Sequence, residues 1–445
     1  MPVAKLLLTM SVPMMISMLV QALYNIVDSM FVAKLSENAL TAVSLAFPVQ
    51  NLMIAVGTGT GVGINALVSR ALGEKKNEYA NSAVNNGIYL AIFSFIGFAI
   101  VCGFFAPAFF SVQTNDPQFQ AYGVDYVRVI GIMSFGLFIQ LCAEKLLQST
   151  GKTIYSMATQ LIGAVINIIL DPIMIFGLFG FPRMEVTGAA LATVTGQIIA
   201  AVIGVIMNIK LNKELHISLV KYKLNGEVIR HIYSVGFPSI IMASVGSVMT
   251  FGMNKILMGF TSTATAVFGV YFKLQSFIFM PVFGLNNGLV PIAAYNYGAR
   301  KPDRITKAIK LSITYGVCIM LAGFVVFQLF PGALLGIFSA SDDMLAIGIP
   351  ALRIISISFL IAGFSVVASS VFQALGHGFL SLAVSVLRQL IVLLPAAFIL
   401  AKVGGLGACW WAFPIAEVFS GAVCFIFIRY TFKKEIHPLY ENAGK

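Results

Sequence analysis

The sequence predicts an all-α integral membrane protein with twelve transmembrane helices in two parallel six-helix repeats. The first reason is composition, since 59% of the 445 residues are hydrophobic and only 10% are charged. The second is a series of apolar stretches, each near the roughly 20 residues with which a helix spans a bilayer. The third is an internal duplication. The apolar stretches lie at residues 10–32, 46–69, 85–107, 126–147, 154–178, 187–209, 233–258, 264–292, 308–330, 350–373, 379–401 and 405–429.

The charged loops and the first stretch indicate the orientation. The first stretch is too long for a cleaved signal peptide, and no small-residue cleavage site follows it. Most of the 28 Lys and Arg residues fall in loops and tails on one side, which places both termini in the cytoplasm. That one-sided distribution argues against a nucleic-acid partner. The five cysteines form no CxxC pair, so neither a metal site nor a disulfide framework is expected.

The two halves of the chain repeat each other at a separation of 225 positions. Matching pairs include Pro13 and Pro238, Gly59 and Gly284, Gly63 and Gly288, Arg128 and Arg353, and Gly151 and Gly376. Six helices per copy give both copies the same orientation. We expect an amino-terminal lobe at 1–209, a cytoplasmic linker at 210–232 and a carboxyl-terminal lobe at 233–445. Two such lobes, rocking about a central cleft, are typical of a secondary transporter. A duplicated scaffold without transport is the alternative.

The first predicted helix carries a carboxylate on a polar face. Gln21, Tyr24 and Asn25 precede Asp28 by seven, four and three positions. These spacings bring all four side chains to one side of a helix.

The fifth and sixth predicted helices carry matching polar stripes. Asn167 and Asp171 lie four positions apart on the fifth, as do Thr193 and Gln197 on the sixth. Pro172 lacks an N–H group, so it is expected to kink the fifth helix and to leave a carbonyl oxygen without its helical partner beside the aspartate. The three stripes together predict a cavity rich in oxygen atoms.

Such a cavity suits a proton or a small cation such as Na⁺. A charge at the middle of a membrane costs roughly 2.5–3.5 kcal/mol on insertion scales, so a buried carboxylate indicates function by default. We expect Asp28 or Asp171 to hold a proton near neutral pH and to release it when the cleft opens inward. The alternative is that both merely hydrogen-bond helices together, a task that hydroxyl or amide groups perform at lower cost.

The second half differs at the corresponding positions. Asp28 aligns with Met253, and Asp171 aligns with Ala396. The second half instead places Lys273, Arg388 and Glu417 within apolar stretches. We expect Glu417 to pair with one of the two bases, either as a structural ion pair or as a contact for substrate.

Two function classes have no residues to support them. The segment "GTGTGVG" at 57–63 looks like a phosphate loop, but it lacks the following GK[ST] and lies within a spanning stretch. No nucleotide partner is therefore expected. The four histidines are scattered in loops and the tail without a catalytic spacing, so we expect neither an enzyme nor a bound cofactor.

Several longer segments together make the chain resemble the multidrug and toxic compound extrusion (MATE) family, and within it the bacterial branches around MepA and DinF. These segments are "LYNIVDSMFVAKL", "GVGINALVSRALGEKK", "LLQSTGKTIYSMATQLIGAVINIILDPIMIFG", "GAALATVTGQ" and "FIFMPVFGLNNGLVPIAAYNYGA". The resemblance covers nearly the whole chain. It implies a V-shaped pair of lobes that exports drugs from the cytoplasm by antiport.

The resemblance also implies a cation site in the first lobe. Its residues carry over as Asp28, Asn167, Asp171 and Thr193, with Thr195 close enough to be the alternative to Thr193. The coupling ion, H⁺ or Na⁺, remains open because both use the same oxygens. Helices seven and eight offer Lys255 and Lys273 instead of acids, which argues against a second cation site in the other lobe.

The expected substrates are amphipathic organic cations. Met and Phe are abundant, at 19 and 37 residues, and Met-rich surfaces repack around varied ligands. The candidate substrate contacts are Gln21, Tyr24, Asn25, Met53, Phe277, Met280 and Phe283. We expect a monomer in the lipid of a bacterial cytoplasmic membrane. A flippase for a lipid-linked precursor, within the same wider superfamily, is the alternative function.

Overall fold

The computed structural model describes residues 1–443, apart from the side chains at 33, 37, 38, 40, 41, 442 and 443. The last two residues of the predicted second lobe lie outside the described residues. Within the described part, all regular structure is helical. The elements are α1 (Val3–Leu35), α2 (Glu37–Gly73), α3 (Asn77–Gln113), α4 (Pro117–Ile132), α5 (Phe135–Ser149), α6 (Thr153–Phe176), α7 (Glu185–Leu211), α8 (Gly226–Met258), α9 (Ser262–Gly298), α10 (Pro302–Leu329), α11 (Pro331–Gly336), α12 (Asp342–Ser356), α13 (Phe359–Ala374), α14 (Gly378–Val386), the π-helical turn Leu387–Leu393, α15 (Leu394–Cys409), α16 (Ala412–Thr431), the π-helical turn Phe432–Ile436 and α17 (His437–Ala443).

The number of spanning segments agrees with the prediction, although two segments are not single helices. Among the described residues, ten spans are long and apolar enough to cross a membrane. Two further helix pairs, α4 with α5 and α12 with α13, bend by 47° and 52°, which gives twelve spans if each pair counts as one. The predicted stretches 126–147 and 350–373 therefore contain broken helices. In the second break, the hydroxyl of Ser358 donates to the carbonyl of Ile355 at 2.7 Å.

The duplication is visible in how the helices begin. The side chain of Ser36 caps α2 by accepting a hydrogen bond from the Ala39 N–H at 3.0 Å. The side chain of Thr261 caps α9 by accepting from the Ala264 N–H, also at 3.0 Å. Both caps lie at the sequence separation of the repeat, and each satisfies a backbone donor that the first turn of a helix leaves without a partner.

Two arginines show the same correspondence. The guanidinium of Arg128 donates through Nε to the Gly103 carbonyl at 3.2 Å, and that of Arg353 donates through Nε to the Gln328 carbonyl at 3.2 Å. Each bond joins the third helical span of a repeat to the first helix of the fourth span. The duplicated all-α architecture that the sequence predicts is therefore confirmed.

The chain divides into two compact units. The amino-terminal unit comprises residues 16–236, and the carboxyl-terminal unit comprises residues 1–15 together with the chain from residue 237 onward. Each unit thus contains the beginning of the first helix of the other repeat. The division falls within α1 close to Pro13 and within α8 close to Pro238.

Equivalent glycines receive these two helix beginnings. In the carboxyl-terminal unit, a Cβ atom on Gly288 of α9 would lie 3.0 Å from the Ser11 Cα atom of α1. In the amino-terminal unit, a Cβ atom on Gly63 of α2 would lie 2.1 Å from the Ile232 carbonyl oxygen of α8. Only glycine permits such an approach of two helix backbones. The matching glycines of the sequence therefore mark matching helix contacts.

The connection between α7 and α8 is held against α3. The side-chain oxygens of three buried asparagines accept hydrogen bonds from its backbone: Asn81 from His216 at 2.8 Å, Asn85 from Ser218 at 2.8 Å, and Asn86 from Asn225 at 2.9 Å. The Tyr89 hydroxyl also donates to the Leu219 carbonyl at 2.6 Å. The helix-free segment therefore lies along α3, within the amino-terminal unit.

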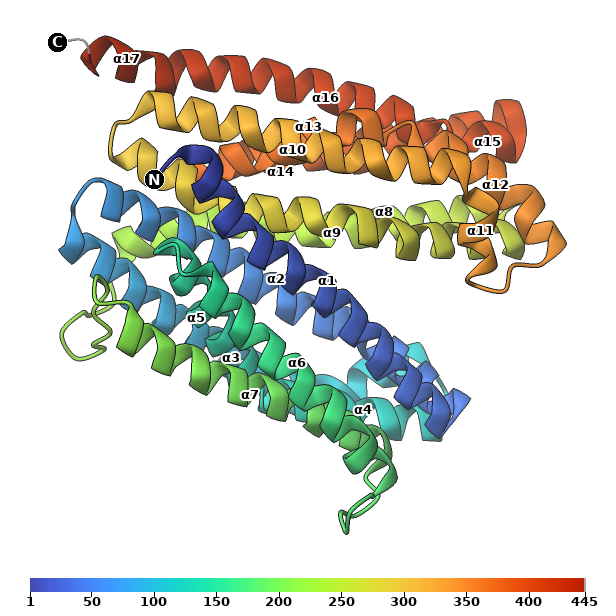
Figure 1. The fold of residues 1–445 in the computed structure, drawn as a ribbon. Helices are drawn as coiled ribbons and strands as arrows, with labels where there is room; N and C mark the ends of the chain where they lie inside the picture. The colour runs from blue at the N-terminus through green and yellow to red at the C-terminus, as the bar shows by residue number, and fades with distance from the viewer. Residues whose placement is uncertain (444–445) are drawn as a thin grey trace. The chain divides into compact units, whose positions relative to one another are not determined.

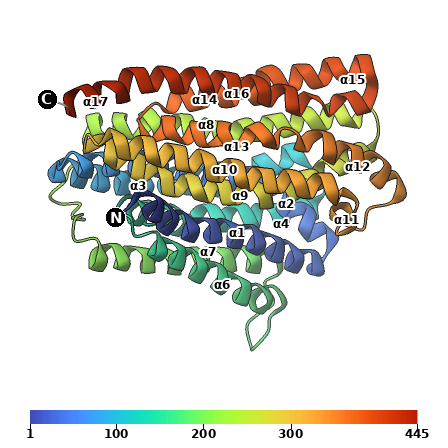
Figure 2. The same ribbon diagram turned by 45° about the horizontal axis from the view of Figure 1, so that its top comes forward.

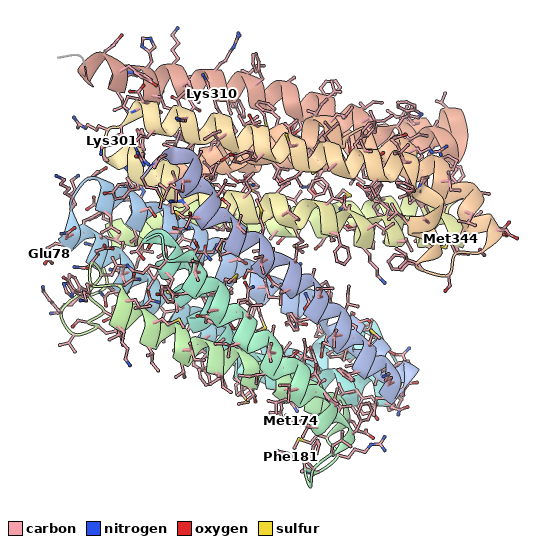
Figure 3. All side chains as sticks on the ribbon, in the orientation of Figure 1. Glu78, Met174, Phe181, Lys301, Lys310 and Met344 are labelled. Carbon is pink, nitrogen blue, oxygen red and sulfur yellow. The ribbon has the colours of Figure 1, made fainter. Side chains whose placement is uncertain are left out.

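The two ends of each unit differ in what they carry. In the amino-terminal unit, Glu78 lies at one end, while Met174 and Phe181 lie at the opposite end (Figure 3). In the carboxyl-terminal unit, Lys301 lies at one end and Met344 at the other.

Within the amino-terminal unit, α6 and α7 run side by side in both ribbon views (Figures 1 and 2). This pair of helices positions the candidate site.

Candidate functional site

Three helices of the amino-terminal unit bring the predicted cation residues together. Asp171 and Asn167 lie one turn apart on α6, at 0% and 2% exposure, and Thr193 lies on α7 at 4%. The Asn167 amide donates to Asp171 Oδ1 at 3.4 Å and to Thr193 Oγ1 at 3.2 Å. Thr193, and not Thr195, is thus the threonine that contacts this asparagine. The four-residue spacings read from the sequence place these groups on facing sides of the two helices.

Asp28 of α1 completes the cluster. Its carboxyl group lies within hydrogen-bonding reach of the Asp171 carboxyl. A hydrogen bond between two carboxyl groups requires that one of them carries a proton, because ionised carboxylates only accept. Three buried oxygens of the cluster have no hydrogen-bond partner among the described residues, namely Asp28 Oδ1, Asn167 Oδ1 and Asp171 Oδ2.

These oxygens give the cluster its chemical character. Carboxylate, amide and hydroxyl oxygens are hard ligands, which suit a proton or a cation such as Na⁺. An unsatisfied acceptor buried in an apolar bundle costs free energy, so each of the three oxygens favours an incoming positive charge. No group of three or more His, Cys, Asp or Glu side chains suited to a metal ion occurs in the described part of the chain. The donor set consists of two carboxyl groups, one amide oxygen and one hydroxyl, all of them hard oxygen ligands.

The predicted kink residue lies within a continuous helix. Pro172 is inside α6, which remains helical as far as Phe176. Gly177 then ends the helix in the left-handed conformation, with φ 74° and ψ 48°. The N–H groups of Gly177 and Leu178 both donate to the Ile173 carbonyl at 3.0 Å.

The other polar residues of α1 differ in their surroundings. Tyr24 lies near enough to Asp28 and Asp171 to interact with their charges. Gln21 accepts a hydrogen bond from the Gln160 amide of α6 at 3.1 Å. The Asn25 side chain is exposed. Of the three residues, Tyr24 and Gln21 thus face α6, where the cation residues lie.

Two further polar residues near the aspartates and Gln21 were not predicted from the sequence. Tyr126 of α4 is almost fully buried, interacts electrostatically with both aspartates, and has its hydroxyl 3.5 Å from Gln50 Oε1. Gln160 joins Gln21 and also hydrogen-bonds Ser17. A signal for Gln160 existed, because it precedes Asn167 by seven positions and so shares its helical face.

The predicted apolar substrate contacts occupy unlike environments. Met53 lies in the core of the amino-terminal unit at 1% exposure. Phe277 and Phe283 of α9 are 37% and 44% exposed, and Met280 between them is half-buried. Phe283 also lines a cavity of the carboxyl-terminal unit.

The carboxyl-terminal unit holds a pair of opposite charges. Glu417 of α16 lies 3.6 Å from the guanidinium of Arg388, which belongs to the π-helical turn Leu387–Leu393. The expectation that Glu417 pairs with one of two bases is confirmed, and Arg388 is that base. Lys273 instead lies over the Phe338 ring, 5.8 Å from its centroid.

The duplicated spanning helices, with polar clusters buried on corresponding helices, define a multi-pass membrane transporter. The MatE family profile matches residues 13–173 and 238–399, one segment in each repeat. The chain therefore belongs to the MatE family, whose members are transporters and not enzymes.

Full-length relatives agree with this assignment. The chain is 28% identical over 444 residues to the multidrug export protein MepA of Staphylococcus haemolyticus, covering 97% of this chain and 94% of the relative. It is 24% identical to the FAD transporter of Shewanella oneidensis, covering 95% and 94%. A solved structure of a multidrug resistance MATE family transporter in its outward-facing conformation matches with a TM-score of 0.92 at 25% identity, covering 99% of this chain and 97% of that one.

Proposed function

We propose that the protein exports amphipathic organic cations from the cytoplasm by antiport, with H⁺ or Na⁺ held at the cluster of Asp28, Asn167, Asp171 and Thr193. One observation carries this proposal: the two carboxyl groups meet inside an apolar bundle, where three oxygens have no partner among the described residues. Buried acids at such positions typically mark ion pathways. Multidrug export is also the activity in the name of the MepA relatives.

The coupling follows from the charge of the cluster. With no cation bound, two carboxylates and a neutral amide carry a net negative charge in a low-dielectric site. A proton shared by the carboxyls, or Na⁺ held by oxygens of all four residues, removes part of that charge. The bound and free states then differ in electrostatic free energy, and this difference allows an ion gradient to bias the conformation of a transporter.

The proposed setting is a bacterial cytoplasmic membrane, with the lobes and linker at 1–209, 210–232 and 233–445. Both chain termini and the basic residues near Lys301 and Lys310 would face the cytoplasm by the positive-inside rule. We propose a monomer as the transporting unit, since one chain contains both six-helix repeats.

Transport in liposomes tests the proposal. The purified protein is reconstituted, and efflux of a fluorescent organic cation is recorded under a pH gradient or a sodium gradient alone. We expect efflux to follow one of the gradients. Asp171→Asn should lower gradient-driven efflux roughly 5–150-fold, the range of typical coupling free energies.

A matched control separates local charge from general loss of charge. Asp303 lies on the exposed first turn of α10, so Asp303→Asn makes the same chemical change away from the cluster and should leave efflux unchanged. Efflux that ignores both gradients, or that persists in Asp171→Asn, would contradict the proposal. Absence of cation efflux, together with movement of a lipid-linked precursor, would instead favour the flippase.

A further inference from the structure

We propose that the carboxyl-terminal unit contains a second ligand site, in which Arg388 binds the carboxylate of a small aromatic acid. The site lies in a cavity of about 200 Å³ between α8, α9, α13 and α14, at the beginning of the π-helical turn. Binding of the acid at this site does not depend on the cation site of the amino-terminal unit. Only the later export of the bound acid rests on the proposed function.

Most of the residues that line the cavity are polar. Arg388, Gln373, Asn287 and the hydroxyls of Ser369, Ser370 and Ser385 line it. Such groups are expensive to bury in a membrane bundle unless they have partners. Ser370 and Ser385 already have hydrogen-bond partners within the protein, so Arg388 and Asn286 are the lining groups that would hold a polar ligand group.

The guanidinium has unused donors. Its single ion pair among the described residues is the one with Glu417, at 3.6 Å, which is longer than a hydrogen bond. The described residues accept none of its five N–H groups in a hydrogen bond. A purely structural ion pair would lock these donors onto the carboxylate. Here they remain available to a ligand that enters the cavity.

Glu417 serves as the counter-charge behind the arginine. It is 6% exposed and is absent from the cavity wall, and its Oε1 has no hydrogen-bond partner in the described part of the chain. The pair is neutral as a whole, which lowers the cost of placing a guanidinium within a membrane-spanning helix. An oxyanion in the cavity would then compete with Glu417 for attraction to the positive charge of the guanidinium.

A second buried group defines what else the ligand must carry. Asn286 of α9 is 7% exposed and lines the cavity. Its amide nitrogen donates to the Val366 carbonyl at 3.3 Å, while its Oδ1 has no partner among the described residues. The ligand should therefore offer an anionic group to Arg388 and a hydrogen-bond donor to Asn286.

The apolar wall and the volume fix the rest of the ligand. Phe283 and Met242 line the cavity beside the polar groups. They are suited to an aromatic ring, since aromatic and thioether side chains pack well on ring faces. A volume of about 200 Å³ is below the roughly 300–1,000 Å³ of sites for drug-sized molecules. A bicyclic aromatic acid with one further polar group fits this description.

Equilibrium binding to the purified protein tests this site without requiring transport. The probes are 6-hydroxy-2-naphthoate and its neutral counterpart 6-hydroxy-2-naphthamide, measured by calorimetry in detergent. We expect the acid to bind at least roughly tenfold tighter than the amide, because one charge-assisted hydrogen bond contributes about that factor to the affinity. Arg388→Gln should remove that preference, and Glu417→Gln should strengthen binding of the acid because the competing carboxylate is gone.

Two further variants keep the test decisive. If Arg388→Gln does not fold, the neutral double variant Arg388→Gln with Glu417→Gln replaces it, because it leaves no buried charge uncompensated. Arg429→Gln removes one positive charge from an exposed position of α16 and should change nothing. Equal binding of acid and amide, or unchanged acid binding in the double variant, would overturn the proposal.

A lipid phosphate is the competing occupant. Dioctanoyl phosphatidic acid is therefore added as a competitor, and we expect it to displace the naphthoate weakly, because the cavity is small. Displacement at concentrations below those at which the naphthoate itself binds would overturn the carboxylate assignment in favour of a lipid headgroup. Because these measurements use no gradient, failure of the cation antiport would leave their outcome intact.

Discussion

The oxygen cluster of the amino-terminal unit and the arginine cavity of the carboxyl-terminal unit lie on corresponding helices of the two repeats. Asn167 and Asp171 belong to the fifth span of the first copy, and Arg388 belongs to the fifth span of the second. Thr193 and Glu417 belong to the two sixth spans. The first cluster presents two carboxyl groups and an amide with unpartnered oxygens among the described residues, and the second presents a guanidinium 3.6 Å from its counter-charge.

This difference teaches how a duplicated bundle acquires two chemistries. The caps at Ser36 and Thr261, and the arginine bonds to Gly103 and Gln328, keep the frame alike in both copies. Within that frame, the second copy places an arginine with its counter-charge where the first copy places two carboxyl groups. The frame sets where polar groups can lie, whereas their identity decides what they bind.

The largest effect is expected for the stability of the carboxyl-terminal unit. Arg388→Gln leaves Glu417 buried without its counter-charge, which should lower the free energy of unfolding by about 3–5 kcal/mol. The double variant with Glu417→Gln should recover most of this loss. Thermal unfolding in detergent measures both. The comparison predicts a much smaller loss for Asp171→Asn, because no buried cation faces Asp171 among the described residues.

The matching glycine contacts test whether the helices pack in the same way in the two repeats. Gly63→Ala and Gly288→Ala each place a methyl group against the backbone of a neighbouring helix. Overpacking of this kind should destabilise each variant by about 1–3 kcal/mol. Gly180, which has nothing within 4 Å of an added Cβ, provides a control position in an exposed loop, although its φ of 84° adds strain of its own. A neutral effect at either helix contact would show that the two frames are not equivalent.

Thr193 offers a finer test of the oxygen cluster. Thr193→Val keeps the shape of the side chain but removes the oxygen that accepts from the Asn167 amide. Loss of one hydrogen bond of about 1 kcal/mol should lower gradient-driven efflux roughly fivefold. Thr195→Val is the matched control two positions along the same helix and should retain efflux. The reverse order of the two variants would move the site to Thr195.

The smallest expected effect concerns the helix caps. Ser36→Ala and Thr261→Ala each remove one capping acceptor and should each lower the free energy of unfolding by about 1 kcal/mol. Thermal unfolding of the two single variants and of the double variant measures whether the losses are equal and additive. Markedly unequal losses would indicate that the two copies stabilise their second spans differently.

The sequence predicted the features that rest on local spacing or on composition. The constant separation of 225 positions pairs Arg128 with Arg353, and the structure gives the two the same backbone contact. Four-residue spacings placed Asn167 beside Asp171 because helical geometry alone decides which residues share a face. The confirmed fold class follows from apolar length in the same way.

Features that depend on contacts between distant segments were missed. The bends between α4 and α5, and between α12 and α13, interrupt apolar runs that read as continuous spans. The partner of Glu417 stayed open because Arg388 lies on a different helix. The cavity around Asn286 draws on residues of α8, α9, α13 and α14, and no single spacing reveals it.

Coupled ion movement tests the central claim most directly. Liposomes containing the protein are loaded with an organic cation, and ion entry is recorded by pH-sensitive and sodium-sensitive dyes as the cation leaves. We predict that one ion moves inward in proportion to cation efflux, and that this movement is lost when Asp28 and Asp171 are both changed to Asn. Ion movement of wild-type size in that double variant would show that coupling occurs elsewhere in the molecule.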